Sequence, residues 1–282
     1  MMAHVMNLTR WEWYKLRRRW LPWIMLAILL FVSQAFIWGS YFFDRSTQSS
    51  DAYYNFSLPG SIPNALGLVH GIGIFLIVIL TASLLGTEYR WRTLRSILSR
   101  GTGRWQYLAS KAVLLALLVG AALLIVTALT AVSSLIATAL AGGAPAGSSS
   151  EAGWIDVPVA FGRGWFGLLP YVALAGFFTV LTTSSAAGTA ISLVYYYAES
   201  IIAAIFLNVF TWFETVADYL LGRNVTGWMT SGDDRMVVNI FLGGGFGEFP
   251  GALHAFLVLM AYILALGGLA LWLFRRRDLT GA

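Results

Sequence analysis

The chain of 282 residues contains no cysteine and only two lysines, Lys15 and Lys111. Without cysteine it can form no disulfide, no thiolate metal site and no cysteine nucleophile. Neither lysine follows a glycine, so the chain has no Gly-Lys-Ser/Thr phosphate loop with which to bind ATP. It also has no Gly-x-Ser-x-Gly turn, and its three histidines lack carboxylates at metal-ligand spacing. We therefore expect this chain to contain no catalytic centre, metal site or cofactor.

Charge is scarce as well. Charged residues make up 11% of the chain and apolar residues 58%, against about 25% and about 45–50% in soluble domains. A membrane-spanning helix needs about 20 consecutive apolar residues, and the sequence has six such runs. We predict an all-α integral membrane protein that forms a single transmembrane domain, residues 1–282. The predicted spans are 21–43, 69–87, 107–140, 165–182, 190–213 and 252–274.

The distribution of charge predicts the orientation of these spans. With the N-terminus inside, fourteen of the 18 cations lie in cytoplasmic segments and nine of the 13 acids lie outside. Because cation-rich loops stay in the cytoplasm, we expect both termini there. The net charge of +5 is then the sum of a positive inner and a negative outer face. It does not indicate a nucleic-acid partner, since no soluble domain presents an arginine cluster.

Residues 1–20 mix tryptophans with five cations, a pattern typical of a helix that lies at the membrane surface against anionic lipid headgroups. A simple cluster of charges that stops translocation is the alternative. On the outer side, proline and glycine in residues 44–67 predict a segment without regular structure. Residues 214–251 carry apolar positions at roughly helical spacing, and we predict short re-entrant helices there.

The connector between the second and third spans, residues 88–111, holds six of the cations. Its first part, 88–104, has an apolar stripe at helical spacing, with Glu88 placed to pair with Arg92. We predict a short helix on the membrane edge whose polar face is free for a cytoplasmic partner. A basic loop that only fixes the topology is the alternative.

One carboxylate, Glu199, lies within a span. An acid in lipid is costly, so it is expected to face the interior of the bundle. Tyr195 and Tyr196 lie one turn before it and Asn208 follows two to three turns later. These four residues are candidates to line a pathway, and a structural hydrogen-bond node between packed helices is the alternative.

The chain resembles the ABC-2 type permeases, the membrane subunits of type V ABC exporters. The resemblance rests on the connector, where Glu88, Thr93, residues 98–101, Arg104 and Lys111 look like the family's coupling-helix region. The basic N-terminal helix, six spans, external helices before the last span and the terminal run 274–278 agree with it. It implies a multi-pass protein of the prokaryotic inner membrane that transports a substrate and has no active site of its own.

What the resemblance implies further is a half-transporter that forms a homodimer or pairs with a paralogous permease. Each copy would dock a separate cytoplasmic ATP-binding cassette subunit, which would hold the ATP and magnesium. The family's coupling role falls on Glu88, Arg92, Thr93, Arg95, Arg100 and Arg104. A secondary transporter or channel that works without ATP is the competing class, but it predicts more intramembrane charge and an inverted repeat. A scaffold that only anchors a partner would leave Glu199 without a purpose.

Overall fold

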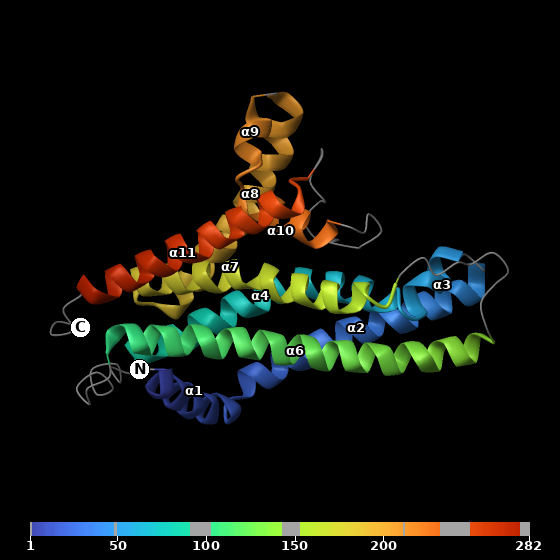
Figure 1. Cartoon of the computed structure of the whole chain (residues 1–282), viewed down its shortest axis with the longest axis horizontal. Helices are drawn as coiled ribbons and strands as arrows, with labels where there is room; N and C mark the ends of the chain where they lie inside the picture. Colours follow the sequence, from blue (N-terminus) through green and yellow to red (C-terminus); the bar gives the residue numbers. More distant parts are fainter. Residues whose placement is uncertain are drawn as a thin grey trace.

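The computed structural model of the chain describes residues 2–47, 50–90, 103–142, 153–210, 212–231 and 249–276. Every regular element in these ranges is an α-helix. Six helices are long and apolar enough to cross a membrane (Figure 1). They are α2 (Trp20–Thr47), α4 (Ser61–Arg90), α6 (Arg104–Ala141), α7 (Asp156–Thr182), α8 (Ser185–Val209) and α11 (Ala252–Arg276). The predicted fold class, an all-α membrane protein with six spans, is confirmed.

Four shorter helices complete the described part of the chain. They are α1 (Met2–Arg17), α3 (Ser50–Phe56), α9 (Phe213–Ala217) and α10 (Leu221–Thr230). Helix α1 covers the segment for which a surface helix is predicted. Helices α9 and α10 lie in the segment before the last span that was predicted to be external, whereas the later apolar positions of that segment, 236–242, fall outside the described residues.

Helices α4 and α7 form the centre of the bundle. Two thirds of the apolar stretch of each is buried, against less than a third for the other four spans. Helices α2 and α6 pack against this pair, and α8 and α11 pack against it as well. The start of α1 and the end of α11 lie at the same end of the bundle, beside the start of α6 (Figure 1). The connector is attached at this end too, because α4 ends and α6 begins there.

Two spans begin eight or nine residues earlier than the sequence predicted. Helix α4 starts at Ser61 rather than residue 69, and its Pro63 lies in the first turn, where a proline removes no intrahelical hydrogen bond. The prediction that residues 44–67 lack regular structure is therefore wrong, since α3 and the start of α4 lie there. Helix α7 starts at Asp156 rather than residue 165, and the Asp156 carboxylate accepts a hydrogen bond from the backbone N–H of Gly153 (2.7 Å).

Helices α7 and α8 are joined by a short turn at Thr183 and Ser184, so α8 begins five residues before the predicted span. The Ser184 hydroxyl accepts a hydrogen bond from the N–H of Ala187 (3.3 Å) and caps the helix. Close approach of the two helices requires Gly188, because a Cβ there would lie 2.8 Å from the Cα of Thr179. The end of α7 and the start of α8 are thereby held tightly together.

Candidate functional site

The two ends of the connector meet at a buried ion pair. Glu88 lies near the end of α4 and Lys111 lies two turns into α6, with 2.7 Å between Glu88 Oε1 and Lys111 Nζ. The hydroxyl of Tyr107 donates a hydrogen bond to the other oxygen of Glu88. Tyr107 and Lys111 are four residues apart and so share a face of α6. Because both carboxylate oxygens are bound, the two flanks of the connector are fixed to each other.

Helix α1 joins the same cluster through Glu12. Its Oε2 lies 2.5 Å from Lys111 Nζ, and its Oε1 lies 2.9 Å from Lys15 Nζ, one turn further along α1. The side chain of Lys111 is only 2% exposed, so this ammonium group is removed from water. A buried charge is tolerated where it is paired and hydrogen-bonded. Lys111 meets this condition by bridging carboxylates from two separate helices.

The electrostatics of Glu12 reflect this arrangement. Burial alone would raise the pKa of its carboxyl group, but the ammonium groups of Lys111 and Lys15 outweigh that effect and hold this pKa below its usual value. Glu12 is therefore ionised at neutral pH, and its charge contributes to holding α1 against α6. Glu12, the single acidic residue of the cationic helix α1, is thus paired specifically with Lys111 of α6.

The last helix is tied to the cluster by Arg104. Its guanidinium donates hydrogen bonds to the backbone carbonyls of Phe274 (3.2 Å) and Arg275, at the end of α11. Carbonyls in the last turn of a helix have no intrahelical partner and favour a cation. The ring of Phe274 also stacks on Tyr107, with centroids 5.6 Å apart and 16° between the planes. We call this cluster the connector base: Glu12, Glu88, Arg104, Tyr107, Lys111 and Phe274.

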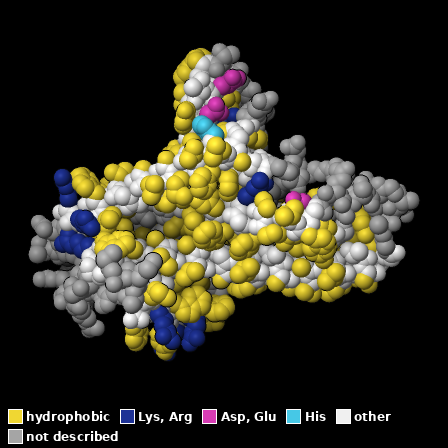
Figure 2. Space-filling model, viewed as in Figure 1, with side chains coloured by type: hydrophobic (Ala, Val, Ile, Leu, Met, Phe, Trp, Pro, Cys, Tyr) yellow, Lys and Arg dark blue, Asp and Glu magenta, His cyan; other side chains and the backbone are white. Residues whose placement is uncertain are grey.

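The connector base lies where cations gather. Figure 2 shows Lys and Arg side chains at the end of the bundle that carries the termini, and most visible Asp and Glu side chains elsewhere. Of the six residues to which a coupling role is assigned by resemblance, the structure describes Glu88 and Arg104. It brings both into the connector base, where Glu88 is 7% exposed. Arg92, Thr93, Arg95 and Arg100 lie outside the described residues, as does the predicted pairing of Glu88 with Arg92.

Glu199 lies at a second cluster, on the side of the bundle away from the connector. Its carboxylate accepts a hydrogen bond from the backbone N–H of Gly222, in the first turn of α10. The side chain of Tyr195 also hydrogen-bonds to it. An N–H in the first turn of a helix lacks an intrahelical acceptor, and the helix dipole favours negative charge there. Glu199 thus caps α10 from a neighbouring helix.

Other contacts hold α10 and the turn before it. The Nε2 atom of His254 lies 2.9 Å from the carbonyl oxygen of Asp218, and the hydroxyl of Tyr262 donates to the carbonyl of Tyr219 (3.2 Å). The indole N–H of Trp228, in α10 itself, donates to the carbonyl of Arg163 in α7 (3.2 Å). Helices α7, α8 and α11 therefore all contribute to the position of α10.

Of the other candidate pathway residues, Tyr195 joins Glu199, whereas Tyr196 lies apart from this pair. Tyr196 packs edge-on against Phe75 of α4 (centroids 5.5 Å apart) and Tyr171 of α7 (5.6 Å), in the core of the bundle. Asn208 lies in the last turns of α8, and its side chain is outside what the structure describes. The structure thus brings together Glu199 and Tyr195 and places Tyr196 on the α4 side of the helix.

A comparison with protein families identifies the chain. The family model described as "ABC-2 family transporter protein" matches residues 8–199, more than half of its length. The chain belongs to the ABC-2 transporter family. No curated protein matches its sequence. This membership makes the chain a membrane-spanning transport component, a permease of the ABC transporter class, and agrees with its six apolar helices.

The part matched to the ABC-2 family includes the whole connector and every residue of the connector base except Phe274. Within it, sequence reasoning missed the roles of Glu12 and Lys111. Lys111 counts among the connector's cations, but its side chain is buried rather than available to a partner. One indication of the role of Lys111 was present in the sequence. Tyr107 and Lys111 are four residues apart, which places a hydroxyl and an ammonium group on one face of the helix near Glu88.

Proposed function

We propose that this ABC-2 permease is the transmembrane subunit of a type V ABC exporter, driven by a separate ATP-binding cassette subunit that docks on the connector. The observation that carries the proposal is the bridge formed by Lys111 to Glu88 and Glu12. It joins both flanks of the connector and α1 at one point. A partner that pushes on residues 91–102 would then move α4, α6 and α1 as one unit.

Movement of α4 would reach the centre of the bundle. This helix is one of the two most buried spans and packs against α7 and α8. The edge-on contact of Tyr196 with Phe75 is one of the links between α4 and α8. Packed interfaces between helices change between discrete arrangements. ATP would act by binding one of two states of the cassette subunit more tightly than the other. The connector base supports such a transmission because its charges are paired and buried.

On the outer side, we propose that Glu199 and α10 respond to this movement. Helix α8 carries Glu199, so a shift of α8 against α11 would change the hydrogen bond to Gly222 that positions α10. Opening there would release substrate outward. Two permease subunits, identical or paralogous, would enclose the pathway between them. Asn208 and Tyr195 are proposed to lie beside it because they share α8 with Glu199.

Co-purification of the tagged chain with a candidate cassette ATPase tests the docking assignment, beginning with any ATPase encoded by a neighbouring gene. Replacing Arg92, Arg95 and Arg100 with glutamate is expected to abolish co-purification. Arg10→Glu on the exposed face of α1 is the matched control and should retain the ATPase. Unchanged co-purification by the triple variant would remove the connector as the docking site. If neither the wild-type chain nor the Arg10→Glu control binds a cassette ATPase, the result would argue for a transporter that works without ATP.

A further inference from the structure

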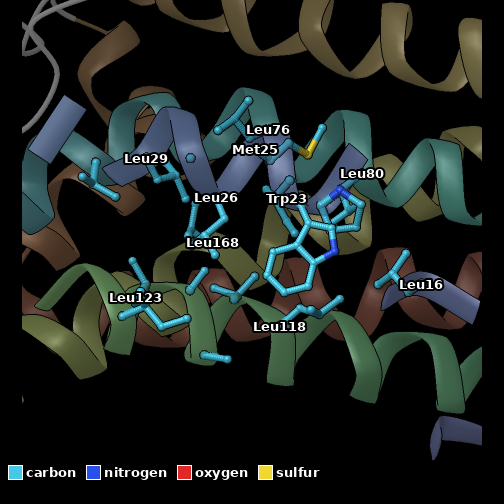
Figure 3. A pocket seen from close by; sticks show the side chains of 18 of the residues that line it. Leu16, Trp23, Met25, Leu26, Leu29, Leu76, Leu80, Leu118, Leu123 and Leu168 are labelled. Atoms are coloured by element: carbon cyan, nitrogen blue, oxygen red, sulfur yellow. The ribbon is translucent and has the colours of Figure 1, made fainter. Parts of the chain in front are cut away.

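A cavity of about 160 Å³ lies among α1, α2, α4, α6 and α7. Figure 3 shows leucine side chains and the indole ring of Trp23 around it. Its lining is hydrocarbon apart from Arg17, which is the one charged residue among the described residues that line it. The cavity is therefore suited to an apolar group with an anionic end.

The cavity is elongated along the helices that enclose it. Its lining runs along α2 from Pro22 to Leu29 and along α6 from Leu118 to Ile125, a length of about 10 Å at 1.5 Å per residue. The cavity exists in part because two of the residues that face it, Gly73 of α4 and Ala122 of α6, have small side chains or none. Apolar cavities do not hold water stably. In a chain that crosses a bilayer, the abundant hydrocarbon that fits an elongated space is a lipid acyl chain.

One end of the cavity lies at the junction of α1 and α2. Trp13, Arg17 and Trp23 line it there, and the indole N–H of Trp23 donates to the carbonyl of Arg17 (3.0 Å). Both tryptophan side chains are about half exposed, and Arg18 follows on the exposed surface. Tryptophan favours the headgroup level of a bilayer, and clustered arginines attract anionic headgroups. The charge of the entrance complements a phosphate.

We propose that this cavity binds one acyl chain of an anionic phospholipid, with the lipid phosphate at Arg17. The lipid would belong to the leaflet on the cationic side of the bundle. This site is distinct from the connector base and from Glu199, and it does not depend on the proposed transport function. Because Leu16 of α1 lines the cavity next to Arg17, the lipid would support the position of α1 on the bundle.

Native mass spectrometry tests this proposal. The purified chain is reconstituted into vesicles of equal phosphatidylglycerol and phosphatidylethanolamine, extracted into mild detergent, and scored for retained lipid. Ala122→Trp fills the cavity from α6, and Leu26→Trp fills it from α2 should the first variant fail to fold. Leu117→Trp, on the exposed side of α6, is the matched control for bulk. Arg17→Gln removes the headgroup partner, and Arg10→Gln is its control on the same helix.

The wild-type chain and both controls should retain phosphatidylglycerol in preference to phosphatidylethanolamine. Filling the cavity should lower retention by roughly tenfold or more, since the ligand's contacts are lost. Arg17→Gln should still bind lipid but lose the preference for the anionic headgroup. Equal retention of the two lipids by the wild-type chain would overturn the proposal. Full lipid retention by both cavity-filling variants would also overturn it. If these variants instead lost dimers while keeping their lipid, the cavity would be assigned to a second copy of the chain, which also overturns the proposal.

Discussion

Lys111 on α6 lies 2.7 Å from Glu88 on α4, although 23 residues separate them in the sequence. Between them runs the connector, so this pair joins the two ends of the connector together with the hydrogen bond from Tyr107 to Glu88. Glu12 of α1 binds the same ammonium group. The cytoplasmic end predicted from the charge pattern is thus organised around a buried cation shared by two carboxylates.

Removing this cation should destabilise the protein strongly. Lys111→Met leaves two carboxylates without their shared partner, and breaking a buried pair in this way costs about 3–5 kcal/mol. The matched control is Lys15→Met, which also removes a partner of Glu12 but whose side chain is 52% exposed. Exposed pairs contribute about 0–1 kcal/mol. Thermal unfolding in detergent measures both variants, and equal effects would contradict the shared-cation description.

The attachment of α1 should depend on pH through Glu12. The pKa of this carboxyl group is lower in the folded protein than its usual value of 4.5, because the ammonium groups of Lys111 and Lys15 outweigh the effect of burial. Its contribution to stability is therefore present above about pH 4.5 and is lost as pH falls through the lower folded value. Wild-type and Glu12→Gln proteins should differ in unfolding temperature at pH 7, and the difference should shrink progressively as the pH is lowered below 4.5. A difference that stays constant across this range would contradict the assignment.

Glu199 should hold α10 through the hydrogen bond to Gly222. In Glu199→Ala, the backbone N–H of Gly222 in the first turn of α10 loses its acceptor, so hydrogen exchange across residues 221–230 should accelerate. Glu199→Gln retains an acceptor oxygen and should change exchange less. If Glu199 also lines the pathway, Glu199→Gln should impair transport in a reconstituted complex while assembly stays intact. Normal transport by this variant would leave Glu199 with the capping role alone.

The packing of α7 against α8 should not tolerate a side chain at Gly188. A Cβ there would lie 2.8 Å from the Cα of Thr179, on the backbone of the facing helix. Overpacking of this kind costs about 1–3 kcal/mol, so Gly188→Ala should lower the unfolding temperature. Gly267→Ala in α11 is the matched control, because open space surrounds that position. It should be neutral or raise stability by about 0.5–1 kcal/mol.

The sequence predicted the helices better than their contacts. Six apolar runs were enough to predict the spans, since a bilayer imposes helix length and composition. The start of α4 was predicted too late, because Pro63 was interpreted as a breaker when it lies in a first turn, where proline is tolerated. The missed pairing of Glu12 with Lys111 depends on how α1 packs on α6, which no local pattern specifies.

At the two predicted carboxylate sites, Glu199 and Glu88, the sequence likewise predicted the residue better than its contacts. The sequence identified Glu199 as a residue that needs a partner and placed Tyr195 one turn away, and Tyr195 does hydrogen-bond to it. Its partner in α10 is a backbone N–H, which carries no signature in the sequence. For Glu88 the sequence predicted a neighbour on the same helix, Arg92. That pairing lies outside the described residues, and the structure shows a partner that the sequence did not predict, Lys111 on α6, because the ends of α4 and α6 meet at the connector base.

The most direct test of the connector base is a distance measurement during ATP turnover. Spin labels at Leu140→Cys and Leu253→Cys would report on the end of the bundle away from the connector, and the absence of native cysteine makes the labelling specific. In a complex with its ATPase, adding ATP should shift the distance between the labels in the wild-type and Lys15→Met proteins. Lys111→Met should keep the ATPase bound but lose the shift. An ATP-dependent shift of the same size in Lys111→Met would contradict the claim that movement enters through this residue.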